Sequence, residues 1–233
     1  MNRVVAVARM QLAHPLITYG LPAAIVSFSF AINWTIWALG DVAAHAPGDG
    51  TTGGVASLYV TVLVFFIQTV AQVFPFAMGL SISRREFYAG TGLTAVLQSA
   101  VYGVALTVLA AVENATNGWG VQLHFWAPAP LDVANLLLQF LVLAMPMLAC
   151  AFIGVGIGAV FTRWGTPGLY ALTVGTLVTA GLAAVLAAWQ DAWGDLGNWL
   201  LDQTATSLAI ALPAGLTLVL AALGFLAIRR AVP

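Results

Sequence analysis

Neutral amide side chains are the residues best placed to do chemistry inside the apolar stretches of this sequence. Gln68 and Gln72 are four positions apart, so a helix would carry both amides on one face. Phe65 and Phe76 extend the same face. An amide moved into hydrocarbon without a partner costs roughly 4–8 kcal/mol. We therefore expect this face either to form hydrogen bonds with other helices or to line a wet path for an amphipathic solute.

Small residues in a later apolar stretch favour close helix packing. Gly154 and Gly158 form a GxxxG pattern, in which helix backbones can approach because no side chain intervenes. Such a pattern serves contacts within one subunit and also contacts between two copies of a chain. We expect packing within the subunit here.

The parts of a catalytic or metal site are missing from the apolar stretches. These stretches contain no Asp, Glu, Lys, Arg or His, and the whole sequence has one cysteine, Cys150. It also has no HExxH motif and no phosphate-binding GxxxxGK[ST] loop. Ion- and proton-coupled carriers usually keep ionisable residues at membrane depth. The sequence therefore predicts no enzyme activity, metal or cofactor in this chain, and a source of energy outside it.

Charged and aromatic residues gather in one short segment, Gly79–Thr91. Ser83 followed by Glu86 fits a capping box, so a helix is expected to begin there. The same segment carries two arginines and two aromatic residues: Arg84, Arg85, Phe87 and Tyr88. Composition alone favours a turn that caps the next apolar stretch and anchors it at the membrane surface.

The elements that would position these residues are membrane-spanning helices. Hydrophobic residues make up 61% of the 233 residues and charged residues only 6%, whereas a soluble domain has about 25% charged residues. A hydrocarbon core about 30 Å thick needs about 20 apolar residues in a helix. Six stretches meet this requirement: Leu16–Leu39, Val55–Leu80, Leu93–Val112, Val133–Phe161, Leu169–Trp189 and Leu208–Ile228. The sequence predicts an all-α polytopic membrane protein with six transmembrane helices.

The distribution of charge predicts the orientation. Six spans place all seven arginines on one side: Arg3, Arg9, Arg84, Arg85, Arg163, Arg229 and Arg230. Apart from Glu86, the acidic residues fall on the other side: Asp41, Asp49, Glu113, Asp132, Asp191, Asp195 and Asp202. Cytoplasmic loops carry an excess of positive residues. We therefore expect both termini in the cytoplasm and the protein in the cell inner or plasma membrane.

Two segments outside the spans have helical character. Residues 1–14 have an apolar side flanked by Arg9, which predicts an N-terminal amphipathic interfacial helix. Gln190–Ser207 alternates apolar and polar residues and is too short to span, which suggests an outer re-entrant segment. No linker is long enough to separate domains, so residues 1–233 are expected to form a single transmembrane domain.

Together these features resemble the membrane (permease) subunit of type-2 ATP-binding-cassette (ABC) exporters. In such a subunit an interfacial helix precedes six spans with both termini inside. Ser83–Thr91 looks like the family's segment between spans two and three. Glu113, followed by Thr116 and Gly118–Gly120, looks like its outer segment after span three. The run Gly154–Gly165 looks like its end of span four, so the resemblance covers nearly the whole chain.

The resemblance implies that this chain forms part of the substrate path and that a different chain hydrolyses ATP. Residues 83–91 would form a cytoplasmic coupling helix that contacts an ABC ATPase through Arg84, Arg85, Glu86, Phe87 and Tyr88. That ATPase would hold ATP and Mg²⁺. A second permease, the same chain or a paralogue, would complete the pair, and no nucleic acid is expected. The second and fifth spans would enclose the substrate path, which corresponds to Phe65, Gln68, Gln72, Phe76, Thr173, Thr176 and Thr179.

The implied function is export of a hydrophobic or amphipathic substrate, such as a drug, lipid or peptide, driven by ATP hydrolysis in the partner. Two other functions fit a six-span chain of this size. One is the solute-binding subunit of an ATP-driven vitamin importer. The other is a passive channel or a structural membrane subunit.

Overall fold

The computed structural model describes residues 3–40, 50–128 and 131–230, and helices dominate these ranges. Asp41 and Asp49, two of the acidic residues expected on the outer side, lie outside them. The elements in chain order are α1 (Arg3–Gln11), η1 (Leu16–Gly20), α2 (Leu21–Gly40), β1 (Gly50–Thr51), α4 (Ala56–Gln68), η2 (Thr69–Val73), α5 (Phe74–Gly79), α6 (Arg84–Ala115), η3 (Gly118–Gln122), β2 (Leu123–His124), α7 (Leu136–Trp189), α8 (Trp193–Asp202) and α9 (Ala205–Arg230). The elements labelled η are π-helical turns.

The architecture is consistent with an all-α membrane protein. Within the described ranges, five helical runs are long and apolar enough to cross a bilayer: Leu16–Gly40, Ala56–Gly79, Arg84–Ala115, Leu136–Trp189 and Ala205–Leu226. Four of these runs each contain most of one predicted span. The remaining run, α7, has 54 residues and contains both the fourth and the fifth.

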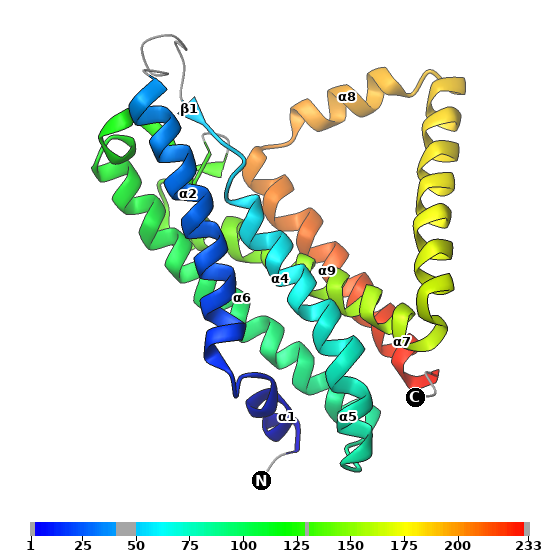
Figure 1. Cartoon of the computed structure of the whole chain (residues 1–233). Helices are drawn as coiled ribbons and strands as arrows, with labels where there is room; N and C mark the ends of the chain where they lie inside the picture. Colours follow the sequence, from blue (N-terminus) through cyan, green and yellow to red (C-terminus); the bar gives the residue numbers. More distant parts are fainter. Residues whose placement is uncertain (1–2, 41–49, 129–130, 231–233) are drawn as a thin grey trace.

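A kink at Gly165 separates the two predicted spans within α7. Gly165 has φ 63° and ψ −153°, a combination that is open essentially only to glycine. Pro167 follows and supplies no backbone N–H. The sequence predicted separate spans joined by residues 162–168, whereas the helix runs up to the kink and resumes directly after it. Figure 1 shows the second half of α7 turning sharply away from the first half.

Most helices form one bundle, and the second half of α7 and α8 extend away from it. The first half of α7 packs against α4, α6 and α9, and α2 packs against α4. The second half of α7 stands apart, and α8 joins its far end to α9 (Figure 1). In the lower part of that view lie α1, the α5–α6 turn and the end of α9, whereas α8 and β1 lie in the upper part. The described arginine-bearing segments therefore gather at one end of the bundle.

The N-terminal helix α1 packs on the start of α6. Val7 is buried and contacts α6 at Gly90, where an added Cβ would lie 2.6 Å from the Cβ of Val7. The side chain of Gln11 is buried and donates to the hydroxyl of Thr91 at 2.8 Å. Residues 3–11 thus form a helix as predicted, but its buried side faces α6.

The π-helical turn η1 is stabilised by polar side chains from the middle of α6. Gln98 donates to the carbonyl of Thr18 at 2.8 Å, and Tyr102 donates to the carbonyl of Tyr19 at 2.7 Å. A π turn displaces backbone carbonyls from the regular helical ladder, and these two side chains satisfy the displaced groups. The polar residues of α6 therefore have a structural role at this turn.

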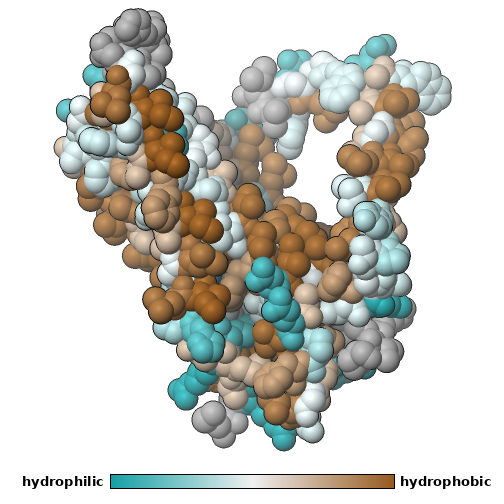
Figure 2. All heavy atoms as spheres, in the orientation of Figure 1, coloured by the Kyte–Doolittle hydropathy of each residue, from teal (hydrophilic) through white to brown (hydrophobic). Residues whose placement is uncertain are grey.

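Large apolar side chains cover the outside of the molecule. On the second half of α7 alone, Leu177, Leu182 and Trp189 have more than half of their surface exposed. Figure 2 shows hydrophobic atoms along the helices, with hydrophilic atoms near the lower end of the view and in one patch at its centre. Monomeric soluble proteins rarely expose apolar patches of this extent. The exposed helices therefore require an apolar surrounding, as a lipid bilayer provides.

Candidate functional site

The charged turn before α6 forms the helix start expected from the sequence. The hydroxyl of Ser83 accepts from the N–H of Glu86 at 3.2 Å, and the carboxylate of Glu86 accepts from the N–H of Ser83 at 2.9 Å. These two bonds complete a capping box. The helix then runs without a break to Ala115, so the predicted separate helix over 83–91 is instead the first two turns of α6.

Only part of the predicted coupling segment faces outward. Arg85 is exposed, and Glu86 forms an ion pair with Arg3 of α1, with 3.8 Å between nitrogen and oxygen. Phe87 is fully buried and packs edge-on against Phe74. Tyr88 is half-buried, and its hydroxyl donates to the carbonyl of Ala221 in α9 at 2.6 Å. The two aromatic residues therefore connect helices of this chain, and Arg85 is the most exposed of the charged residues in the segment.

The amides of the predicted substrate path face outward. Gln68 and Gln72 are exposed, and neither contacts another described residue through a side-chain hydrogen bond. Phe76 is also exposed, whereas Phe65 is half-buried against Phe66. The expected hydrogen bonds from these amides to other helices of the chain are therefore not formed. Figure 2 shows hydrophilic atoms within the hydrophobic surface over this part of the bundle.

The threonines of the predicted path are split between two surfaces. Thr173 and Thr176 line an apolar cleft of about 590 Å³ between the two halves of α7 and α9. Thr179 lies outside that cleft, on a shallower surface of the same helix. Each of the three hydroxyls donates to the carbonyl four residues earlier, at 2.7–3.0 Å. The hydroxyl protons are thus used within the helix.

This partly open space, which we call the α7–α9 cleft, lies beside two threonines of the predicted path. Its other lining residues are apolar: Ile153, Gly156, Ile157, Val160, Leu172, Leu177, Leu220, Leu223 and Gly224. None of the lining residues is ionisable. The cleft is therefore suited to an apolar ligand, and it contains no group able to act as a nucleophile activated by a base.

Gly154 and Gly158 lie where α7 crosses α4 and η2. A Cβ added at Gly154 would lie 2.4 Å from the carbonyl oxygen of Leu63, and one at Gly158 would lie 2.7 Å from the Cβ of Val70. Backbone atoms cannot move aside as the end of a flexible side chain can. The GxxxG pattern therefore serves contact within the subunit.

The buried carboxylate of Glu113 lies at the other end of α6 and was not among the functional residues predicted from the sequence. Glu113 has no exposed surface. One of its oxygens accepts from the N–H of Phe125 at 2.9 Å and from the indole N–H of Trp119 at 3.2 Å. The N–H groups of Trp126 and Ala127 complete its partners at 3.2 and 3.5 Å. These hydrogen bonds to Glu113 hold the segment 119–127 against the end of α6, and we call them the clasp.

The clasped segment has an unusual backbone. Asn117, Trp119 and Gln122 have φ values of 51°, 58° and 57°. Non-glycine residues rarely adopt positive φ, which costs of order 1–3 kcal/mol for each residue. The rings of Trp119, Phe125 and Trp126 surround Phe30 of α2 at centroid distances of 5.2–5.3 Å. A signal in the sequence was available, because an acid directly after an apolar stretch is followed by a Gly-Trp-Gly turn.

Comparison with protein families, curated proteins and solved structures finds no match for this chain. The described residues also contain no group of three or more His, Cys, Asp or Glu side chains close enough together to hold a metal ion. The functional assignment therefore depends on the chemistry of the charged turn and the α7–α9 cleft.

Proposed function

We propose that this chain is the permease subunit of a type-2 ABC exporter, in which a separate ATPase supplies the energy. The observation that carries the proposal is the braced, capped start of α6, which presents charge at the arginine-bearing end of a bundle of apolar helices. In this proposal that end is cytoplasmic, and the helices cross the membrane six times.

The start of α6 is suited to transmit a push from a cytoplasmic partner. Arg84, Arg85 and Glu86 form the contact, and α1 braces the same turn through Arg3 and through Val7 against Gly90. A contact made by charged side chains provides specificity for a partner of complementary charge. Because α1 holds the start of α6 at two points, a push on the charged side chains moves the whole segment.

Phe87 and Tyr88 then pass the movement inward. Phe87 packs on Phe74 at the end of the second span, and Tyr88 bonds to α9 at Ala221. Gly224 of α9, which borders Tyr88, also lines the α7–α9 cleft. The two aromatic residues therefore act in this proposal as internal connections between the ATPase contact and the cleft.

The substrate of such a permease is an uncharged or amphipathic molecule with a large apolar part. The α7–α9 cleft lacks ionisable groups, and its two threonine hydroxyls are bonded within their own helix. Gln68 and Gln72 supply the exposed amides, which in an assembled pair face the second permease across the substrate path. Transport requires that the substrate bind the inward and outward states with different affinity.

Reconstitution with an ATPase tests the assignment. The chain is purified together with a candidate ABC ATPase and placed in proteoliposomes, and its stimulation of ATP hydrolysis is measured. We expect Arg85→Glu to reduce the stimulation at least about tenfold, because charge reversal places like charges across the contact. Arg9→Glu is the matched control, since Arg9 is exposed at the same end of the bundle but on α1.

Each result of this experiment has a clear meaning. Equal stimulation by the Arg85→Glu and unmodified proteins would remove the coupling assignment. Stoichiometric copurification of a vitamin would indicate the importer subunit instead. Solute flux that does not depend on ATP would indicate a passive channel.

A further inference from the structure

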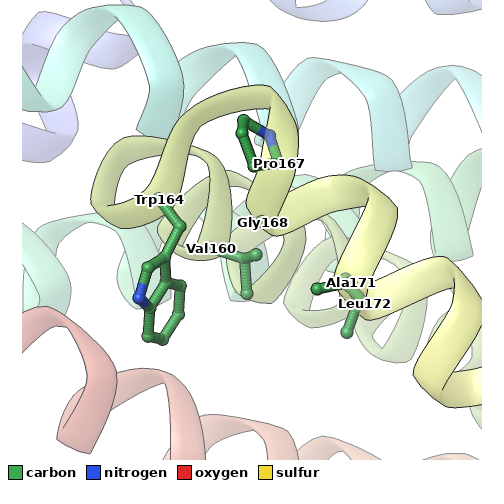
Figure 3. Close-up of a pocket in the computed structure, with 6 residues that line it drawn as sticks. All are labelled: Val160, Trp164, Pro167, Gly168, Ala171 and Leu172. Atoms are coloured by element: carbon green, nitrogen blue, oxygen red, sulfur yellow. The ribbon is translucent and has the colours of Figure 1, made fainter.

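The α7–α9 cleft continues into a second hollow at the kink of α7. The kink pocket has a volume of about 460 Å³ and shares Val160 and Leu172 with the cleft. Figure 3 shows Trp164 at one end of this pocket and Ala171 and Leu172 at the other. From Val160 to Ile153 the cleft follows about 10 Å of helix, at about 1.5 Å per residue. The two hollows thus form one elongated apolar groove that begins at Trp164.

A cation lies beside the end of this groove. Arg163 is exposed, and its guanidinium carbon lies 4.4 Å from the ring centroid of Trp164. Among the residues that the structure describes, Arg163 forms no ion pair. An arginine stacked on an indole keeps its hydrogen-bond donors available around its edge, and those donors match a phosphate in geometry.

If both halves of α7 cross a bilayer, this pair lies at the level of the lipid headgroups. Arg163 and Trp164 end the first half of α7, and the 54-residue run that contains both halves is apolar enough to cross a membrane. Tryptophan is enriched at the boundary between water and hydrocarbon, and arginine near the end of a span reaches toward the headgroups. Basic pockets between membrane helices are known to bind anionic lipid headgroups.

We propose that the groove is a binding site for one anionic phospholipid. Its phosphate contacts the guanidinium of Arg163, and one acyl chain lies along the α7–α9 cleft. The assignment uses both parts of the site, because the apolar lining matches the acyl chain and the guanidinium of Arg163 matches the headgroup. It does not depend on the transport function proposed above.

A polar ligand or a second protein chain matches the groove less well. The hydroxyls of Thr173 and Thr176 donate within their own helix, so the cleft has no free donor for a polar solute. The groove is bounded by three helical segments of one chain and has an apolar lining. An acyl chain matches that lining, and the bilayer supplies it at high concentration.

Native mass spectrometry of the detergent-purified full chain tests the proposal. Phosphatidylglycerol and phosphatidylcholine with identical acyl chains are titrated separately, and the affinity for the first bound lipid is compared. We expect phosphatidylglycerol to bind more tightly, and Arg163→Gln to weaken its binding about fivefold, which equals about 1 kcal/mol per basic residue at a membrane surface. Arg163→Lys, which keeps the charge, should retain most of the preference.

A second variant tests the acyl-chain part of the site. An added Cβ at Gly156 meets no atom within 4 Å, and Gly156 lines the cleft, so Gly156→Leu places a larger apolar side chain in the cleft with no clash at its Cβ. We expect it to weaken the first binding step for both lipids. Gly181→Leu is the matched control, because Gly181 is equally open but lies on the second half of α7 outside the lining of the cleft.

The proposal is overturned if the two lipids bind with equal affinity, or if Arg163→Gln leaves the preference for phosphatidylglycerol unchanged. It is equally overturned if Gly156→Leu and Gly181→Leu behave alike. Loss of a dimer in Gly156→Leu without loss of lipid would assign the cleft to a second copy. Displacement of the lipid by inorganic phosphate alone would show that the acyl chain contributes nothing.

Discussion

Removal of the Glu113 carboxylate is the sharpest test of the fold at the end of α6 opposite the charged turn. Glu113→Ala leaves the backbone N–H groups of Phe125, Trp126 and Ala127 without their acceptor. All three residues are buried, so water cannot easily replace the carboxylate. The indole N–H of Trp119 loses its partner as well.

The expected cost follows from these bonds. A hydrogen bond to a charged group contributes about 1.5–3 kcal/mol, and a buried donor left without a partner costs about 1–3 kcal/mol. The losses are not additive, because the segment relaxes once its clasp is gone. We expect the free energy of unfolding to fall by about 4 kcal/mol, which lowers the melting temperature by about 8–16 °C at 2–4 °C per kcal/mol.

The chain contains its own reporter for the measurement. Cys150 is the single cysteine and is partly buried in α7. A dye that becomes fluorescent on reaction with a thiol therefore reports unfolding when the detergent-solubilised protein is heated. Emission from Trp119 and Trp126 reports the local environment of the clasp in the same sample.

Asp132→Ala is the control for Glu113→Ala. Asp132 is an exposed acid that accepts from the side chain of Asn114, so its removal should change the free energy of unfolding by less than about 1 kcal/mol. Glu113→Gln should fall between the two variants, since it keeps one oxygen but turns an amide toward N–H donors. A melting temperature of Glu113→Ala within about 2 °C of the unmodified protein, roughly 1 kcal/mol or less, would show that the clasp does not stabilise the fold.

Four further substitutions and one control, Gly181→Ala, test other contacts through the thermal unfolding of the purified protein. Gly154→Ala should lower the free energy of unfolding by about 1–3 kcal/mol because its Cβ meets backbone at 2.4 Å, whereas Gly181→Ala, with open space around it, should raise it by up to about 1 kcal/mol. Equal effects would contradict the close crossing of α7 and α4. Ser83→Ala should cost about 1 kcal/mol through loss of the cap, and no loss would place the start of α6 elsewhere. Tyr88→Phe should cost about 1 kcal/mol by removing the bond to α9, and an unchanged stability would mean that this bond is not formed. Gly165→Ala should cost about 1–3 kcal/mol because the φ of the kink is positive, and a stabilised variant would contradict that conformation.

The helices could be predicted from the sequence because their length and hydropathy are local properties. A run of about 20 apolar residues has few alternatives to a helix in a bilayer, since every backbone polar group must be satisfied within the segment. The capping box at Ser83 was predictable for the same reason, because it depends on residues three positions apart. The kink was less visible, because Gly165 and Pro167 are typical both of a loop and of a sharp turn between helices.

The rotation of each helix about its axis could not be predicted in this way. Gln68 and Gln72 share a helix face, as their spacing requires, but composition does not say which neighbour that face meets. In a membrane helix apolar residues cover both the lipid side and the packed side, so amphipathic pattern gives little guidance. Glu113 shows a different difficulty, because the Gly-Trp-Gly turn marks the segment but three of the partners of Glu113 are backbone N–H groups, which no residue type identifies.

The uninterrupted course of α6 has a mechanical consequence. Its 32 residues contain no proline, whereas the other long helical runs each contain at least one. At about 1.5 Å per residue this rod is about 48 Å long, so a tilt of about 5° around its middle displaces each tip by about 2 Å in opposite directions. The rod is held near one tip by α1 and at the other by the Glu113 carboxylate. A force applied at Arg84 would therefore shift the rings of Trp119, Phe125 and Trp126 sideways at the opposite end of α6.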